Sequence, residues 1–313
     1  MLRFIVRRAL AGVVLVLVVS SLTFFLLRSN GTSVARTLLG ETATPGQIAR
    51  KQHELGLDRS LLTQYTDWLS HAVRGDLGIS SLSNTPVTTA LTDRLPVTLS
   101  VVLGAVLVTT VLAVLLGVTA AVRRGAADRL VQVFAVIGFA LPGVWFALVL
   151  ILFFAIRLRW FPATGYTPFA DSPGKWFLSL ALPVTALAVS SIASTAQQVR
   201  SAMIETLERD YIRTLRSRGL SERRVVYGHA LRNAAPTALT VVSLHLISLL
   251  GGTVLVEKVF ALPGIGTLAV NSTVGGDTPQ VLGVVVMMVT VVVVVNLLLD
   301  IANGWLNPKV RVR

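Results

Sequence analysis

Long apolar runs recur along the chain, and they restrict its fold more than any other feature. The first extends from about Ala9 to Leu27, which as a helix is long enough to cross roughly 30 Å of hydrocarbon. Inside a bilayer every backbone N–H and C=O group must find a partner within the protein, and this favours helices. With 53% hydrophobic and 14% charged residues, the chain is too apolar for an ordinary soluble domain. We therefore predict an all-α integral membrane protein with six transmembrane helices, the other five being at residues 96–122, 130–156, 176–199, 236–256 and 281–299.

The segments that join these runs fall into two sets with different charge. One set holds 17 lysines and arginines against 6 acidic residues, and the other holds 11 against 9. Because basic loops stay on the cytoplasmic side of a membrane, the first set is predicted to be cytoplasmic, together with both termini. The net charge of +13 then reflects topology and not nucleic-acid binding. The first set is residues 1–8, 123–130, 200–235 and 300–313, and the second is residues 28–95, 157–176 and 257–279.

The first apolar run also has the basic start that a cleaved signal peptide would have. It is longer than a usual signal-peptide core, and the sequence LLRSNGTS after it offers no small-x-small cleavage site. We interpret it as an uncleaved first span, and we divide the chain into residues 1–28, an extracytoplasmic helical loop at 29–95 and a core at 96–313. Within that loop, Thr44-Pro45 predicts a helix start, Gly56 a stop and Ser60 to Val73 a second short helix.

The one long polar run in the second half of the chain is Arg200 to Pro236. Its first part has apolar residues at helical spacing, and Gly219 is expected to end that helix because glycine adopts the left-handed conformation without a Cβ clash. Ser221 is suited to cap a second helix. Two interpretations stay open, a basic loop that only fixes topology and a docking element that transmits force to a soluble partner. The apolar stripe consists of Ile204, Leu207, Tyr211, Ile212 and Leu215.

Polar residues inside the predicted spans are few. Ser190, Ser194 and Gln198 recur every fourth residue in the fourth span, where they either bond to other helices or line a path for solute. His245 in the fifth span is a functional candidate because ionisable groups are costly in hydrocarbon, and a neutral, hydrogen-bonded state is the alternative. A single histidine does not make a metal site, so no metal ligand is predicted. Pro142 is expected to kink the third span.

The chain has no recognisable catalytic motif. It lacks G-x-x-x-x-G-K-[ST], so it has no loop that would cradle the phosphates of ATP, and it lacks cysteine altogether. Residues Gly264-x-Gly266-x-x-Ala269 match a dinucleotide fingerprint in form only, because no strand precedes them. We therefore expect no enzyme activity and no cofactor on this chain.

Several segments resemble one family of transport proteins. The run DYIRTLRSRGLSERRVVYGHALRNA resembles the cytoplasmic coupling loop of ABC-importer permeases, although Leu215 and Ser217 stand where the family usually has small residues. EKVFALPGIG is similar to the family's external segment after the fifth span, and LGLD and GDLG to its external loop. The match is to the B-type permease of dipeptide and oligopeptide importers, which implies the type I importer architecture.

The resemblance also implies roles for individual residues. ATPase coupling falls on Glu205, Asp210, Tyr211, Arg213, Thr214, Arg216, Arg218, Gly219, Leu220, Ser221 and Glu222. An external segment near the outer gate comprises Glu257, Phe260, Pro263, Gly264 and Gly266. Candidate path-lining residues are Ser190, Ser194, Gln198 and His245.

The implied function is a permease subunit of a binding-protein-dependent importer in the bacterial inner membrane. Its expected partners are a second homologous permease, two cytoplasmic ATPases that carry ATP and magnesium, an extracytoplasmic binding protein and a peptide. Relatives of this type also take up nickel, glutathione and other solutes, so another solute is one alternative. A transporter that works alone, with His245 in its mechanism, is another.

Overall fold

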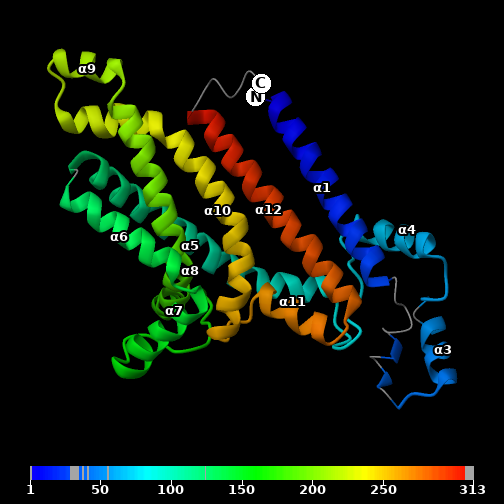
Figure 1. Cartoon of the computed structure of the whole chain (residues 1–313). Helices are drawn as coiled ribbons and strands as arrows, with labels where there is room; N and C mark the ends of the chain where they lie inside the picture. Colours follow the sequence, from blue (N-terminus) through cyan, green and yellow to red (C-terminus); the bar gives the residue numbers. More distant parts are fainter. Residues whose placement is uncertain are drawn as a thin grey trace. The chain divides into compact units, whose positions relative to one another are not determined.

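The computed structural model describes residues 2–28, 35–36, 39–40, 42–54, 56–123 and 125–306. Helices make up most of this part of the chain, and an isolated bridge between Ile79 and Pro86 is the strand-like pairing within it (Figure 1). The all-α prediction is confirmed. The helices are α1 (Leu2–Arg28), α3 (Pro45–Glu54), α4 (Leu61–Ala72), α5 (Val87–Arg123), α6 (Ala126–Ala140), α7 (Gly143–Leu150), η1 (Ile151–Arg157), α8 (Pro173–Leu207), α9 (Asp210–Ser217), η2 (Arg224–Ala230), α10 (Leu231–Val259), α11 (Ile265–Val274) and α12 (Thr278–Leu306).

Five helices of the described chain are long and apolar enough to cross a membrane, namely α1, α5, α8, α10 and α12. A sixth span is formed if α6 and the α7–η1 segment are counted together, although the two halves meet at 101°. The prediction of six spans agrees with this count.

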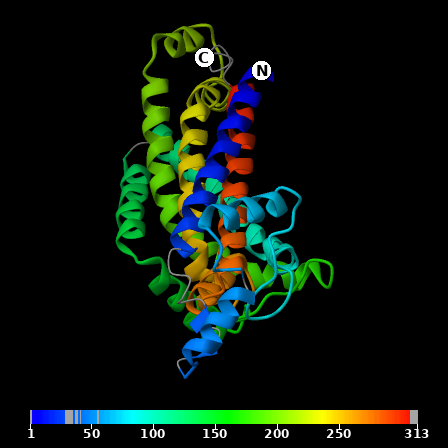
Figure 2. The ribbon, with the colours of Figure 1, turned by 90° about the vertical axis from the view of Figure 1, so that its right-hand side faces the viewer.

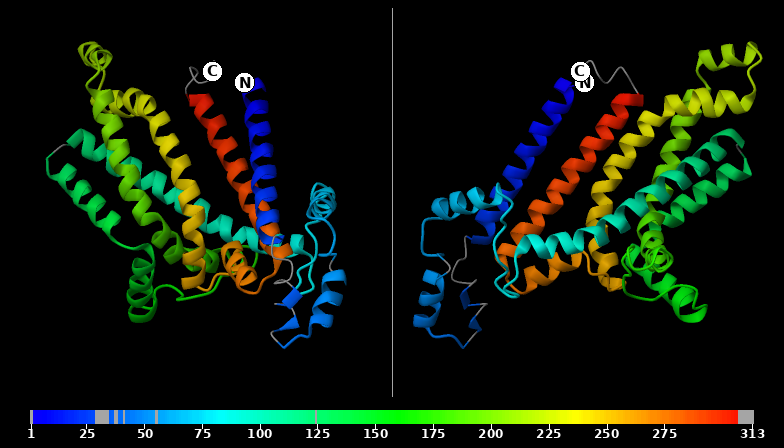
Figure 3. Two further views of the ribbon diagram at one scale, coloured as in Figure 1. Left: turned by 45° about the vertical axis from the view of Figure 1, so that its right-hand side comes forward. Right: turned by 180° about the vertical axis from the view of Figure 1, so that it is seen from behind.

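The bend between α6 and α7 lies where the sequence places a kink. Leu141 has an extended conformation, with φ −82° and ψ 118°, because a residue before proline is pushed out of the helical region. Pro142 then precedes the first residue of α7. Figure 3 shows α7 turning away from the direction of α6. The break is much sharper than the kink expected of a proline inside one continuous span.

Two other prolines do not mark helix boundaries, contrary to prediction. Pro96 was expected to open the second span, but α5 already begins at Val87, directly after Pro86. Pro236 was expected to open the fifth span, but it lies inside the helix that continues from η2 through α10. In membrane helices neighbouring groups satisfy the carbonyl that proline leaves without a donor, so proline is tolerated in the interior.

The chain forms two compact units, and the division falls inside α5 and α12. The first unit contains Leu99–Leu262 and the chain from Asn296, and the second contains Leu2–Thr98 and Pro263–Val295.

In the first unit, α8 lies at the centre and packs against α6, α7 and α10. Close approach of α5 to α8 depends on Gly117, because a Cβ there would lie 2.7 Å from the carbonyl oxygen of Ala196. Small residues allow such backbone contact between membrane helices, where apolar burial alone provides little driving force. The short helix α9 lies at the end of this unit opposite α7 (Figure 1).

In the second unit, α1 packs against α4 through aromatic side chains. Phe24 contacts Tyr65 and Trp68, and the Tyr65 hydroxyl lies 2.6 Å from Ser21 Oγ. Figure 2 shows α1 alongside α12, and a Cβ at Gly12 would overlap Val293. A separate apolar cluster joins α5, α11 and α12 through Leu77, Val87, Leu91, Ile265, Leu268 and Val284.

The local signals predicted for the external loop are confirmed. Thr44 Oγ1 accepts a hydrogen bond from the Gln47 amide at 3.4 Å at the start of α3, and Gly56 has a φ of +63° after its end. Ser60 caps α4 by accepting a hydrogen bond from the Thr63 amide. These short-range features follow from the chemistry of capping side chains and glycine, which acts within a few residues.

Candidate functional site: the loop between α8 and α10

The polar stretch after α8 folds as the sequence predicts in outline, with one correction. The stripe from Ile204 to Leu215 was expected to form one helix, but α8 ends at Leu207 and α9 begins at Asp210. Arg209 between them is extended, with φ −69° and ψ 146°. The stripe gives no signal of this break because its apolar residues face the same cluster on both sides of it.

Gly219 ends α9, as predicted. Its φ is +80°, and its amide donates to the Arg216 carbonyl at 3.0 Å, while the Leu220 amide donates to the Leu215 carbonyl at 3.3 Å. Ser221 then starts the next helix, since its carbonyl accepts from the amides of Arg224 and Val225. Helix, glycine turn and helix therefore follow one another in the predicted order.

The loop is fixed to the rest of its unit by a buried apolar cluster, which we call the loop cluster. Ile212 of α9 is fully buried in it, and Tyr211 and Leu215 pack on its edge. The Asn233 side chain also donates to the Tyr211 hydroxyl at 3.0 Å, joining α9 to α10. The cluster consists of Val118, Ala121, Val199, Met203, Ile212, Val225, Val226, Ala230 and Ala234. Because these residues come from α5, α8, α9, η2 and α10, displacing α9 would disturb all five elements.

The outer face of the loop is polar and charged. Arg216 pairs with Glu222 across the glycine turn, and Arg209 pairs with Glu205 at 2.8 Å. Arg213 lies 3.9 Å from Asp210, which is too long for a strong contact. The residues exposed on this face are Glu205, Asp210, Arg213, Thr214, Arg216, Arg218, Gly219, Ser221 and Glu222, and Tyr211 and Leu220 are half-buried.

The Arg216 and Glu222 pair has an electrostatic signature. Its hydrogen bonds lower the pKa of the Glu222 carboxyl and raise the pKa of the Arg216 guanidinium, because each charge is stabilised by the other. Both side chains line a pocket of about 330 Å³ whose apolar wall includes Ala121 and Val122. Of the residues predicted to couple, Arg213, Arg216 and Glu222 line this pocket.

The external segment is divided between the two units. Glu257 and Phe260 end α10 in the first unit, where both side chains are buried and the Phe260 carbonyl accepts from the Gly165 amide at 2.9 Å. Gly264 precedes α11 in the second unit, where the Ile265 amide donates to Thr98 Oγ1 at 2.8 Å. Pro263 is exposed and Gly266 is buried in the first turn of α11. The segment thus leads from the end of α10 into the short helix α11.

The candidate path residues of the first unit do not share one environment. Ser194 is buried, and its Oγ lies 2.8 Å from His245 Nε2 while donating to the Ser191 carbonyl. Ser190 is exposed and lines a pocket of about 350 Å³ with Ser248. Gln198 is exposed. The structure therefore joins Ser194 to His245 and leaves Ser190 and Gln198 apart from them.

Three polar contacts were not foreseen. Arg200 forms a two-pronged ion pair with Asp128, linking α8 to α6. Ser80 and the Ser81 amide both donate to Asp277, which is fully buried at the start of α12. A charged residue at the end of an apolar run is the signal that could have drawn attention to Asp128 and Asp277, but it does not identify the partner.

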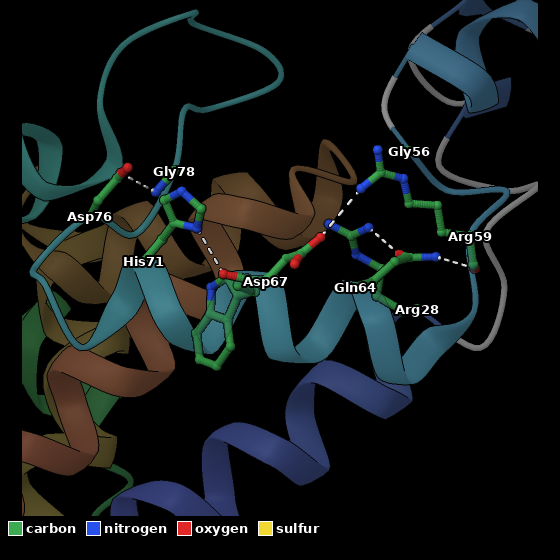
Figure 4. A pocket seen from close by; sticks show the side chains of 9 residues that line it. Arg28, Gly56, Arg59, Gln64, Asp67, His71, Asp76 and Gly78 are labelled. Carbon is green, nitrogen blue, oxygen red and sulfur yellow. Dashed lines mark hydrogen bonds and ion pairs between the residues drawn. The ribbon is translucent and has the colours of Figure 1, made fainter.

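A pocket of about 280 Å³ lies in the second unit (Figure 4). Arg28 donates to Gln64, Gln64 donates to the Arg59 carbonyl at 2.9 Å, and Arg59 lies 3.3 Å from Asp67. The His71 ring and the Asp67 carbonyl are 2.8 Å apart. The bond between Arg28 and Gln64 therefore joins the end of α1 to α4, while Gln64 and His71 also bond to backbone carbonyls.

No group of three or more side chains able to hold a metal ion occurs within the described part of the chain. The fold and the loop together define a class: a multi-pass helical membrane protein with a charged loop between two long apolar helices. Comparison with known proteins gives the family. Residues 113–312 match the model for the binding-protein-dependent transport system inner membrane component, and residues 1–102 match that for the N-terminal part of such membrane components. The chain belongs to this family of inner-membrane permeases.

Individual relatives agree over the full length. The di/tripeptide transport system permease protein DppB of Pseudomonas aeruginosa is 35% identical, with 99% of each chain covered. The probable peptide ABC transporter permease protein y4tP of Sinorhizobium fredii is 36% identical, over 98% of this chain and 99% of its own. A solved structure of the MetNI methionine ABC transporter is 18% identical with a TM-score of 0.51, covering 68% of this chain and 92% of that one. That likeness supports the importer-permease fold.

The resemblance seen in the sequence is thereby confirmed. The protein is a transport permease of the inner membrane, and permeases of this family work with ATPase and binding-protein partners. The comparisons favour this function over a transporter that works alone.

Proposed function

We propose that this chain is one of two homologous permease subunits in an ATP-driven importer of dipeptides or oligopeptides. The names of its relatives support peptide as the substrate class, since DppB is named for di- and tripeptides and y4tP for peptides. Two ATPase subunits on the cytoplasmic side would bind ATP and magnesium, and an extracytoplasmic binding protein would deliver the peptide. Both termini and the loop at 200–235 would be cytoplasmic, and residues 29–95 would lie on the opposite side.

The observation that carries the proposal is the way the loop between α8 and α10 is built. Ile212 is buried in the loop cluster, while Asp210, Arg213 and Arg218 on the same loop are exposed. A loop that passes motion from a soluble partner to the membrane helices needs a charged outer face that binds the partner. It also needs an inner face packed firmly against those helices. The predicted coupling residues supply the outer face, and the loop cluster supplies the inner one.

In the proposed mechanism, closure of the two ATPases on ATP displaces the loops docked on them. Because the loop cluster joins α9 to α5, α8 and α10, the displacement changes the positions of these helices and exposes the path to the other side of the membrane. ATP shifts this equilibrium only through its different affinity for the two states. The residues we assign to coupling are Glu205, Asp210, Tyr211, Arg213, Thr214, Arg216, Arg218, Gly219, Leu220, Ser221 and Glu222.

The remaining assignments follow from position. Ser190 is a better candidate for the path than Ser194, because it lines an open pocket while Ser194 is engaged with His245. We assign Glu257, Phe260, Pro263, Gly264 and Gly266 to the external segment near the gate. A permease for another solute, such as nickel or glutathione, is the alternative within the family.

Affinity purification of this chain from its native membrane in mild detergent tests the proposal. We expect it to bring with it one similar permease and one or two ATPases that contain a P-loop. Competition of peptides for uptake then distinguishes a peptide importer from a permease of another solute. A chain recovered alone and monodisperse would contradict the assignment of the loop as an ATPase dock.

A further inference from the structure

A pocket of about 290 Å³ lies beside the coupling loop but is lined by no residue of α9. Its walls come from the end of α5 and from the helix that starts after Ser221. The floor is apolar, with Val118, Val122 and Val226, and Val122 remains 41% exposed. The polar lining residues are Arg123, Arg223, Thr119 and Tyr227, together with Glu222.

The charge of this pocket is positive. Glu222 also lines it, but both Glu222 oxygens accept hydrogen bonds from Arg216, at 2.6 Å and 3.1 Å. Among the described residues no acidic side chain pairs with Arg123 or Arg223. The two arginines therefore remain available to an anion from outside the chain.

The position of the pocket indicates which anion. Arg123 is the last residue of α5, whose apolar stretch is one of the candidate membrane spans, so this wall lies where a span reaches the aqueous boundary. Tyr227 is 59% exposed beside an apolar surface, and tyrosine is enriched at this boundary. A soluble anion would gain nothing from the valine side chains, whereas a phospholipid presents a phosphate together with apolar acyl chains.

We propose that Arg123, Arg223 and Tyr227 form a binding site for the headgroup of an anionic phospholipid. The phosphate would be held by the two guanidinium groups, and the glycerol and upper acyl chains would cover Val122. Since Val118 and Val226 also belong to the loop cluster, an occupied site would stabilise the base of the coupling loop. The proposal rests on the membrane location of this family and is independent of which solute is transported.

The test uses the full-length chain in detergent with an equimolar mixture of phosphatidylglycerol and phosphatidylcholine. Native mass spectrometry measures the ratio of the two lipids retained. Because each arginine near an anionic surface contributes about fivefold to the affinity for an anionic lipid, we expect R123Q/R223Q to reduce the preference for phosphatidylglycerol by about 25-fold. The matched control R209Q/R232Q removes two exposed charges away from the pocket and should keep the preference of the wild type.

The single variant R223Q alters one exposed side chain, so it remains informative if the double variant fails to fold, and it should reduce the preference by about fivefold. If R123Q/R223Q and R209Q/R232Q lowered the preference for phosphatidylglycerol equally, the effect would be one of general charge, and the proposal would be overturned. Displacement of the lipid by millimolar inorganic phosphate would assign the pocket to a soluble anion instead. Loss of the lipid from chain purified with an ATPase would assign it to that protein partner.

Discussion

The guanidinium of Arg216 closes across the glycine turn onto the carboxylate of Glu222, with Nη2 2.6 Å from Oε1 and Nε 3.1 Å from Oε2. The two residues stand on opposite sides of the turn that ends α9, so their ion pair holds together the two helices of the coupling loop. Both side chains are about half exposed, which limits the energy of the pair.

The pair should make a small, pH-dependent contribution to stability. The pKa of Glu222 is lowered in the folded state, so the contribution is present above its unfolded pKa of about 4.3 and is lost as the pH falls through the folded value. A double-mutant cycle with R216Q and E222Q should give a coupling free energy of about 0.5 kcal/mol near neutral pH. Thermal unfolding across the acid range measures it, and a coupling that persisted after Glu222 is protonated would contradict the assignment.

Replacing Gly219 tests the turn itself. A Cβ at this position would meet no atom within 4 Å, so the effect of substitution comes from the φ of +80° and not from a clash. We expect Gly219→Val to cost about 1–2 kcal/mol in the turn and to abolish transport while the protein stays in the membrane. Gly219→Asn is the matched control, because asparagine tolerates this conformation and should retain uptake. Normal uptake by the valine variant would refute the coupling assignment.

Removal of the buried Asp277 side chain should destabilise the second unit. Asp277→Ala leaves the Ser80 hydroxyl and the Ser81 amide without their acceptor, which we expect to cost about 2–4 kcal/mol. Thermal unfolding measures the whole loss in free energy of unfolding. Faster hydrogen exchange at the Ser81 amide would show that the loss arises at this contact. The control is Asp76→Ala, which removes one exposed hydrogen bond to the Gly78 amide and should cost about 0.5 kcal/mol. If both variants lost a similar free energy of unfolding, burial of Asp277 would not be the cause of the destabilisation.

Ala261 offers a stabilising substitution. Its φ is +50° directly after the end of α10, where the Leu262 amide bonds to the Glu257 carbonyl at 2.8 Å, the pattern in which glycine is preferred. Ala261→Gly should raise the free energy of unfolding by about 0.5–1 kcal/mol. The same change at Ala269, inside α11, should lower it by about the same amount. Opposite shifts of the two unfolding midpoints are the expected result.

Features set by a few neighbouring residues were predictable from the sequence. The helix start at Ser60, the left-handed Gly219 and the change of direction at Pro142 each depend on local backbone chemistry, and all three occur where predicted, although the bend at Pro142 is sharper than the expected kink. The length of the apolar helices follows from hydrocarbon thickness, which requires about 20 apolar residues for each span. The loop between α8 and α10 was identifiable as a separate segment because it is polar between two apolar runs.

Features that depend on distant contacts were not predictable. The break between Leu207 and Asp210 interrupts a periodic stripe whose residues pack on one cluster, so periodicity alone indicates a continuous helix. The partners Asp128 and Arg200 are 72 residues apart, and nothing in either segment indicates the other. The helix starts predicted at Pro96 and Pro236 were wrong. In a membrane protein, tertiary packing compensates for the hydrogen-bond donor that proline lacks, so proline is tolerated inside a helix.

The loop cluster also has a consequence for how this sequence can change during evolution. Val118, Met203 and Val226 come from three helices far apart in the chain yet occupy one densely packed volume. A larger side chain at one of them requires a smaller one at another, so these positions are expected to vary together across related permeases. The exposed arginines of α9 are under no such volume constraint, and under the proposed docking they are expected to vary with the surface of the ATPase.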